Sequence, residues 1–540
     1  MRQAVMFGVL LAVGLLSAPR AEACGGFFCS QVPIDQAGER IVFGVSGNSV
    51  EAHIQIQYKG AAEEFAWVVP MQAKPTLGIG SARLFSYLDA VTQPSFQLQW
   101  EESCRPLFGG IPVGAPQEDN AGPPSAGGGG GVVVVSREDV GPYDAAILTA
   151  NDAVALRTWL TTNGYDIPES AGKALEPYVG NGYYFVALKL QQDKTVGDLR
   201  PIVVKFEGNR PCVPIRLTAI AAQPDMPIIA YVLAQKRAVP INYRHVLINP
   251  TKVDWLGFGR NYAQVATEAV DEAGGQAFLT EFAGSAVNFA QSFAQMNRGL
   301  DTAALASIPH PVDFFSEMLA QGFQGDSTTL ALMRKYVPMP QALVAQGVPE
   351  TQFYNSIWNY RYDIDSDPGR PPFNAKGFAQ ELEAQVVQPL KTATTLLTSH
   401  PYLTRLYTTM SAEEMTVDPD FDFNTDAPDV SNRFTAKARF ESCQDDFSKR
   451  EVRIELPDGR YFFVKFNQPI DQGPSAQRVE QYSTEGAPAV VQDNGPAILS
   501  AIEELGGGMA GGCGCGATDA GSAAMLALVL GAWSLRRRRD

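Results

Sequence analysis

The segment 183–234 reads YYFVALKLQQDKTVGDLRPIVVKFEGNRPCVPIRLTAIAAQPDMPIIAYVLA and decides the fold class. It contains four short runs rich in β-branched and aromatic residues, at 183–190, 201–206, 213–220 and 227–234. Prolines and glycines separate these runs, as they commonly separate the strands of β-rich proteins. Four short strands at this spacing favour a mostly antiparallel sandwich or open sheet.

The sequence before this segment carries further β patterns. Alternating or β-branched runs predict strands at 40–45, 50–58, 64–70 and from 132 onward. Apolar spacing predicts helices at 83–90 and 152–161, the second capped by Asn151 or Asp152. Between them, residues 109–131 have too few apolar side chains to fold, which predicts a flexible Gly/Pro insertion.

The pattern changes near Tyr262, after which apolar residues recur every three or four positions up to about Met415. We expect six to eight helices there, one of them over 401–410 (PYLTRLYTTM). A β-hairpin with an Asp458-Gly459 turn follows, and we expect it to rejoin the earlier sheet. Residues 468–512 are polar and contain Gly and Pro, which predicts a disordered stalk.

These patterns predict an α+β protein with a mostly antiparallel β-sheet or sandwich, an α-helical region and a returning C-terminal hairpin. The expected organisation is a signal peptide (1–23), a β-rich region (24–255), a helical region (256–429), a hairpin that completes the first domain (430–467), the stalk (468–512) and a C-terminal tail (513–540).

The N-terminus has the parts of an export signal. Arg2 supplies positive charge, residues 5–16 are apolar, and residues 21–23 (Ala-Glu-Ala) offer the small residues that signal peptidase accepts. We expect cleavage before Cys24. A cysteine at this place leaves lipidation open, although residues 21 and 22 do not match the Leu and small residue of a lipoprotein signal.

The tail also carries a signal for the location of the protein. It reads GGCGCGATDAGSAAMLALVLGAWSLRRRRD at 511–540. Its apolar run, 520–535, is shorter than the roughly 20 residues that cross a bilayer comfortably. One interpretation is a plain membrane anchor, with the basic end on the cytoplasmic side. The glycine-framed cysteines, the short apolar run and the arginines also resemble the myxobacterial C-terminal sorting tail, which implies cleavage by a sorting protease and attachment to the cell surface or outer membrane. The residues concerned are Cys513, Cys515, Arg536, Arg537, Arg538 and Arg539.

Without residues 1–23 and 513–540, the chain has 36 basic and 55 acidic side chains, a formal charge of −19. This charge argues against nucleic acid and anionic membranes as partners, and it suits cations.

Five segments resemble the bacterial domain of unknown function 2330: CGGFFC at 24–29, AWVVPM at 66–71, YYFVALKL at 183–190, PIRLTA at 214–219 and HPYLTRLYTTMSAEEMTVDPDF at 400–421. The resemblance covers most of residues 24–470. It implies a domain boundary and no activity.

The cysteines of the exported part are candidates for disulfide bonds, since an extracytoplasmic compartment permits them. They are Cys24, Cys29, Cys104, Cys212 and Cys443. Cys24 and Cys29 could close a small loop and two of the others could join distant segments, but the odd number leaves the pairing open. A zinc site is not indicated, because there is no C-x-x-C and the chain has four histidines.

Two aspartate clusters are candidate calcium sites, because alternating carboxylates in a turn can converge on one hard cation. They are Asp363, Asp365 and Asp367, and Asp418, Asp420 and Asp422. The second has EF-hand spacing but Phe423 where that loop needs Gly. The alternative is that both clusters simply face water, with Phe421 and Phe423 packed inward.

The sequence contains no H-E-x-x-H, G-x-S-x-G or Walker A motif. We therefore expect an exported, surface-anchored, non-catalytic structural or binding component of the envelope with an unidentified extracellular ligand. The alternatives are a secreted hydrolase that uses carboxylates or a Cys/His pair, and a calcium-dependent surface adhesin.

If the tail is a sorting signal, the mature surface protein lacks residues 536–539. Mass spectrometry of the surface fraction should find peptides from 468–512 but no Arg-rich C-terminal peptide. An intact Arg-rich peptide in that fraction would show that the tail is a permanent anchor.

Overall fold

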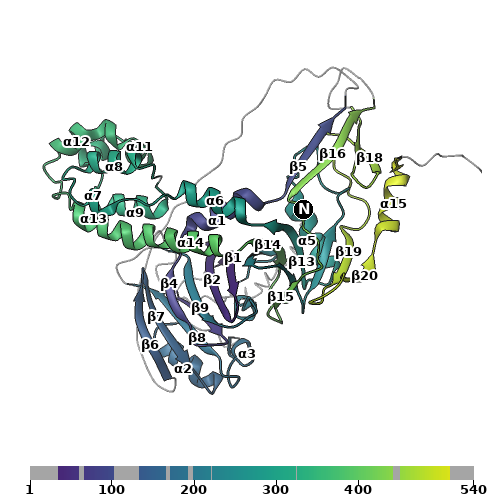
Figure 1. The fold of residues 1–540 in the computed structure, drawn as a ribbon, viewed down its shortest axis with the longest axis horizontal. Coiled ribbons are helices and arrows are strands. Elements are labelled where there is room, and N and C mark those ends of the chain that lie inside the picture. Colours follow the sequence, from purple (N-terminus) through teal and green to yellow (C-terminus); the bar gives the residue numbers. More distant parts are fainter. Residues whose placement is uncertain are drawn as a thin grey trace, which may run out of the picture.

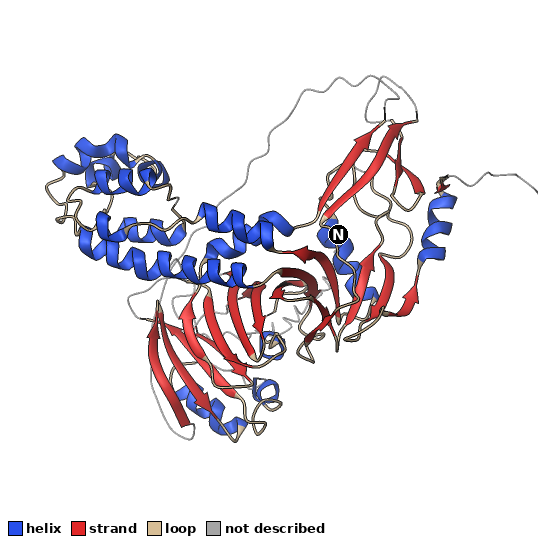
Figure 2. Ribbon diagram, viewed as in Figure 1, coloured by secondary structure: helices blue, strands red, loops and turns tan. Residues whose placement is uncertain are grey.

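The computed structural model describes residues 35–59, 66–101, 133–165, 171–191, 199–220, 222–323, 325–441, 450–466 and 468–510. The signal peptide, the insertion 109–131, the tail, and Cys24, Cys29, Cys104, Cys443, Cys513 and Cys515 lie outside these ranges, as do the four arginines at 536–539. Sheets and helices share the described chain, which confirms the α+β class (Figure 2). None of its described helices is long and apolar enough to span a membrane.

A ten-stranded mixed sheet forms the centre of the molecule (Figure 1). Only the pairs β1/β10 and β12/β13 run parallel, and the other neighbours are antiparallel. In spatial order, the strands are β20 (Ala489–Asp493), β19 (Ala476–Gln481), β12 (Arg244–Ile248), β13 (Ala277–Ser285), β14 (Tyr402–Met410), β10 (Met226–Ala234), β1 (Asp35–Ser46), β2 (Ser49–Lys59), β9 (Ile202–Glu207) and β4 (Thr76–Ile79).

Both faces of this sheet are buried near its middle. Alternate residues of β10 enter two separate cores: Ile228, Ala230 and Val232 on one face, and Tyr231 and Leu233 on the other. The second face packs against helices α1 (Ala82–Thr92) and α5 (Tyr262–Glu272). Such two-sided burial explains the continuous apolar run at 227–234.

A four-stranded antiparallel sheet packs on the first face and makes a sandwich. Its strands are β3 (Ala66–Met71), β8 (Tyr184–Leu190), β7 (Tyr143–Thr149) and β6 (Val133–Val140), with α2 (Ala153–Thr162), α3 (Ala171–Leu175) and α4 (Ile215–Thr218) outside. The Asp152 cap of α2 is confirmed by bonds from Val154 N and Ala155 N. The strand predicted at 213–220 is wrong, because Pro214 is followed by the single helical turn α4.

A long helical arm, residues 287–399, is inserted between β13 and β14 (Figure 1). The last residue of β13, Ser285, lies opposite the first residue of β14, Tyr402, so the arm leaves and returns at one point. Its elements are α6 (Val287–Met296), α7 (Thr302–Leu305), α8 (Pro311–Ala320), α9 (Ser327–Tyr336), α10 (Gln341–Ala345), α11 (Glu350–Asn355), the 3₁₀ helix η2 (Ile357–Tyr360), α12 (Arg361–Ser366), α13 (Ala375–Leu382), the π-helical turn η3 (Glu383–Val387) and α14 (Gln388–Ser399).

The base of the arm packs directly on the sheet. A Cβ atom at Gly44 of β1 would lie 2.3 Å from Leu396 Cδ1, so glycine permits the close approach of α14. Apolar side chains form one continuous core from the sheet into the arm.

The helix predicted over 401–410 is wrong: these residues form β14, at the middle of the large sheet. The four-residue spacing of Tyr402, Leu406 and Met410 fits a helix face, but nearly all of the strand is buried on both sides. A strand buried on both faces shows no polar alternation, and periodicity alone does not distinguish it from a helix. The predicted helical region therefore also contains β13, β14 and β15 (Phe421–Asn424).

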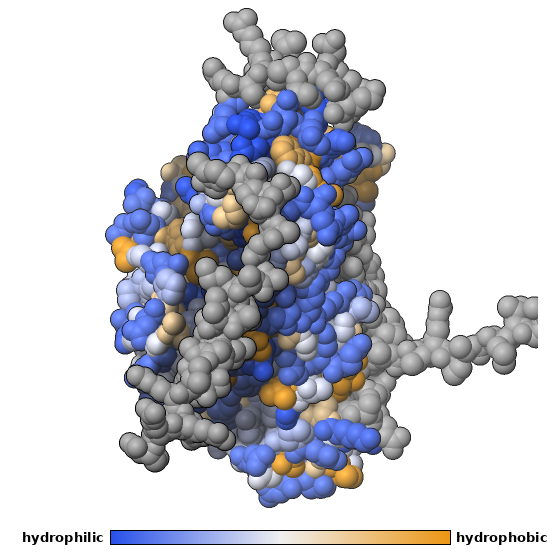
Figure 3. All heavy atoms as spheres, turned by 90° about the vertical axis from the view of Figure 1, so that its right-hand side faces the viewer, coloured by the Kyte–Doolittle hydropathy of each residue, from blue (hydrophilic) through white to orange (hydrophobic). Residues whose placement is uncertain are grey.

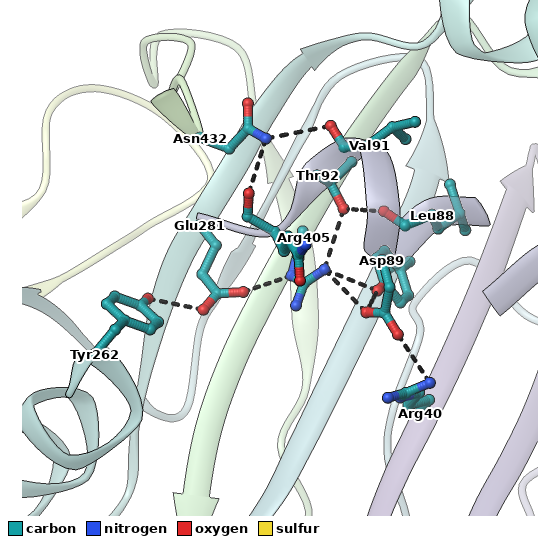
Figure 4. A network of polar contacts seen from close by, with 11 residues as sticks. Arg40, Leu88, Asp89, Val91, Thr92, Tyr262, Glu281, Arg405 and Asn432 are labelled. Atoms are coloured by element: carbon teal, nitrogen blue, oxygen red, sulfur yellow. Dashed lines mark hydrogen bonds and ion pairs between the residues drawn. The ribbon is translucent and has the colours of Figure 1, made fainter. Parts of the chain in front are cut away.

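Arg405 of β14 is buried and holds several elements together (Figure 4). Its Nε donates to Glu281 Oε2 of β13, and its Nη1 donates to Asp89 Oδ1 of α1 at 3.0 Å. Tyr262 of α5 donates to the other oxygen of Glu281 at 2.7 Å, and Arg40 of β1 pairs with Asp89 at 2.8 Å. Burial raises the pKa of Glu281, and Arg405 offsets only part of this effect.

A five-stranded sheet lies beside the large one and contains the predicted hairpin. Its order is β21 (Gly508–Met509), β18 (Arg460–Val464), β17 (Val452–Glu455), β16 (Arg433–Phe440) and β5 (Ser95–Trp100). The hairpin β17–β18 is confirmed, but it joins this separate sheet through β16 instead of the earlier one. A smaller pair joins β11 (Arg237–Pro240) to β15.

The disordered stalk predicted at 468–512 is wrong over its described part. Residues 476–509 contain β19, β20, α15 (Gly495–Glu504) and β21. Ile498 and Ile502 form a buried stripe on α15, and Ser475 N and Ala476 N donate to Glu272 of α5. These contacts bring order to a segment whose composition is polar.

Replacing Arg405 by Met should destabilise the fold strongly, because the buried Glu281 carboxylate would lose its Arg405 partner and Asp89 would keep only Arg40 as a cationic partner. We expect a loss of about 3–5 kcal/mol in the free energy of unfolding, measured with urea. Arg334→Met, which breaks the exposed pair with Glu350, is the control and should cost at most about 1 kcal/mol. Equal losses in the two variants would contradict the assigned role of Arg405.

Candidate functional site

The outer part of the helical arm contains a cavity of about 470 Å³, called the arm cavity below. Its walls come from α8, α9, the α11–η2 corner and the turn before α9. Phe315 and Met318 of α8 face Leu330 and Met333 of α9 and Ile357 of η2. A largely apolar cavity of this volume is in the range of protein sites for small ligands and inserted side chains.

The rim of the arm cavity exposes large apolar side chains to water. Leu319 is 52% exposed and Trp358 is 48% exposed, and both line the cavity. By contrast, the face of the molecule in Figure 3 is largely hydrophilic, with apolar residues in small separate patches where it is not covered by grey atoms. Exposed apolar residues around a concavity are a feature of binding sites.

A second, smaller cavity of about 40 Å³ lies between the two sheets and is lined partly by Cys212 and Asp418. Tyr178 donates to Asp418 Oδ2 at 2.6 Å, and Arg216 N donates to Oδ1 at 3.1 Å. Burial raises the pKa of the Cys212 thiol, and the nearby Asp420 and Asp418 raise it further. A protonated thiol is a poor nucleophile, so this arrangement does not activate Cys212.

Cys212, one of the five candidates for a disulfide, is a free thiol in the structure. Cys212 forms a backbone bridge with Asp420, and its charged neighbours are Asp420, Asp418 and Arg216. The Cys/His arrangement considered from the sequence is therefore not found at this cysteine. The other candidate cysteines lie outside the described residues.

The structure does not bring the predicted calcium ligands together. Asp363 and Asp365 lie on α12, where Asp365 pairs with His310 at 3.0 Å, and Asp367 accepts from Gly369 N. Asp418 is held by Tyr178, and Asp422 pairs with Arg210 at 2.7 Å. In the described ranges, no group of three or more His, Cys, Asp or Glu side chains is arranged to hold a metal ion.

Thr280, His245 and Glu480 form a buried chain of hydrogen bonds. His245 Nδ1 lies 3.0 Å from Glu480 Oε2, and His245 Nε2 lies 3.0 Å from Thr280 Oγ1, the order of groups in a nucleophilic triad. However, Arg237 Nη2 also donates to Thr280 Oγ1, and none of these residues lines either cavity described above. The bonds among the four side chains tie β11, β12, β13 and β19 together.

The sequence did not point to the arm cavity. It selected the aspartates of α12, whereas the acid that lines the cavity is Asp326. The available signal was an Asp-Ser-Thr-Thr helix cap before an apolar stripe, which predicts a helix but not a cavity.

The His245–Glu480 pair should make stability depend on pH. Burial lowers the pKa of His245, so protonation favours the unfolded chain, in which histidine titrates near pH 6.5. Stability should therefore fall as the pH drops from 7.5 to 5.5, by up to about 1.4 kcal/mol per pH unit from this group. His245→Asn should flatten the profile measured by urea unfolding.

His310→Asn is the control for that experiment, because His310 lies on the arm and Asn can also cap α8 there. It should keep the wild-type slope. If the stability of His245→Asn fell with pH as steeply as that of the wild type, His245 would not govern the pH dependence.

A comparison with family models identifies residues 18–341 as matching the model described as "Uncharacterized protein conserved in bacteria (DUF2330)". The match includes the four-stranded sheet, seven strands of the large sheet and the arm up to the first residue of α10, whereas β14, β19 and β20 lie beyond it. It stops before the segment 400–421 that also suggested the resemblance. No curated protein and no solved structure matches the chain. Because the match covers more than half of the chain, the protein belongs to this family of uncharacterised bacterial proteins.

Proposed function

We propose that the protein is exported, attached to the cell surface through its processed C-terminus, and serves there as a non-catalytic binding component of the envelope. The signal-like N-terminus and the tail that resembles a myxobacterial sorting signal support the location. The strongly acidic composition of the exported part suits a soluble protein domain outside the cytoplasm.

The observation that carries the binding role is the arm cavity. It has the volume of a ligand site, its lining is mostly apolar, and its rim exposes Leu319 and Trp358. Its position in an insertion, outside the central sheet, allows an occupant to reach it without disturbing the sandwich.

The chemistry of the lining indicates an apolar ligand or apolar ligand group. Ser327, Thr329 and Asn355 add a few polar atoms, a small polar share that fixes orientation in many binding sites. Met318 and Met333 can adjust their conformations to different shapes, because methionine is unbranched and flexible.

The neutral fluorescent probe N-phenyl-1-naphthylamine should bind the purified protein saturably, with a change in Trp358 emission. Met333→Trp should weaken this binding about tenfold or more, because the indole would occupy the arm cavity and exclude the probe. A Trp358→Phe variant should bind the probe but lose the emission change.

Val344→Trp is the matched control, since Val344 is exposed on the same arm but does not line the cavity. It should bind like the wild type. Thermal melting of each variant checks that the arm remains folded. Equal binding by the Met333 and Val344 variants, or no saturable binding by the wild type, would refute the arm cavity as the binding site.

A further inference from the structure

We propose that the occupant of the arm cavity is a basic amphipathic helix of a partner protein, whose apolar face lies in the cavity and whose lysine or arginine binds Asp326. This inference rests on the proposed function and deepens it by naming the chemistry of the partner.

The shape of the cavity supports the first part of the proposal, that the apolar face of a helix lies in it. Phe315, Met318 and Leu319 are spaced as i, i+3 and i+4 on α8, and Leu330 and Met333 are spaced as i and i+3 on α9. Two helices therefore present apolar stripes toward a shared concavity. An amphipathic helix that enters such a groove places its own i, i+3, i+4 and i+7 side chains between the stripes.

The charge of the cavity lining supports the second part of the proposal, that a lysine or arginine of the partner binds Asp326. Among the described residues that line the arm cavity, Asp326 is the one whose side chain is charged at neutral pH, and no lysine or arginine is among them. Its Oδ1 caps α9 by accepting from Thr329 N and Thr329 Oγ1, both at 2.9 Å. No hydrogen bond from the described residues reaches Oδ2, so this oxygen can accept a bond from a cation on the occupant.

The net charge of the whole arm also favours a positively charged partner. Residues 287–399 contain ten Asp or Glu and seven Lys or Arg, a net charge of −3 without histidine. Five of the seven cations pair with arm carboxylates: Arg334, Lys335, Arg361, Arg370 and Lys391. The arm therefore presents excess negative charge, which attracts a basic partner and repels fatty-acid or other anionic ligands.

One cation approaches the cavity from outside the arm. Arg83 of α1 lies 5.3 Å from the centre of the Phe323 ring and donates to Asn297 Oδ1 at 2.8 Å. Its guanidinium lies over the ring of Phe323, which lines the cavity, and Arg83 does not itself form part of the lining. Arg83 is also attracted electrostatically to Asp326, so a cation of the partner would share this carboxylate with it.

The test uses the full chain and two synthetic helical peptides with identical leucine positions. One peptide carries lysine at all its polar positions, and the other carries glutamate. The lysine peptide should displace N-phenyl-1-naphthylamine and bind at least about tenfold more tightly than the glutamate peptide at low salt. Asp326→Asn should weaken the lysine peptide about threefold to tenfold and leave binding of the neutral probe unchanged.

Asp301→Asn is the matched control, because Asp301 caps α7 in the same arm and does not line the cavity. Since Asn also caps helices well, both variants should stay folded. Tighter binding of the glutamate peptide or of dodecanoate, or an equal effect of Asp301→Asn and Asp326→Asn, would overturn this inference. Probe binding without binding of either peptide would refute the helix alone, whereas loss of all binding would refute the proposed function too.

Discussion

A buried guanidinium must be neutralised inside the protein, and the rest of the central architecture depends on how Arg405 meets this constraint. Desolvation of one charge costs several kcal/mol, so partners must lie within hydrogen-bond distance. Glu281 comes from the neighbouring strand β13, and Asp89 comes from α1, far away in the sequence. Glu281 and Asp89 both reach Arg405 only when α1 lies over β13 and β14. The network therefore selects one register of these two strands and one position of the helix.

The same pair of strands explains how the protein carries a large helical insertion. Since Ser285 and Tyr402 are cross-strand neighbours, the arm begins and ends at adjacent points of a rigid sheet. Its inner helices continue the core of the sheet, and side chains of its outer helices α8, α9 and α11 line the arm cavity. A site built this way can change its lining without altering the sandwich, because few contacts connect the cavity to the sheet strands.

Sequence reasoning succeeded where a β-branched run or a regular apolar spacing marked a segment. Strands β1, β2, β8, β9 and β10 and helices α1 and α2 lie close to their predicted positions, because their patterns are regular and their turns contain Gly, Pro or a capping Asp. It failed at β14, where burial on both faces removes the alternation, and at 476–509, where Glu272 and the β19 pairing order a polar segment. For the candidate site, it found helices but not the cavity, because a cavity depends on how α8, α9 and η2 pack.

The sequence by itself determined the α+β class, the strand-rich first half, the helical texture after Tyr262 and the hairpin at Asp458-Gly459. These are local properties, fixed by periodicity and turn chemistry within a few residues. The tertiary structure alone decided that 402–410 is a central strand, that Cys212 is a half-buried free thiol, and that Asp326 lies at an apolar cavity. Each of these depends on the side chains that distant segments bring into contact, and the spacing of residues along the chain does not encode that proximity.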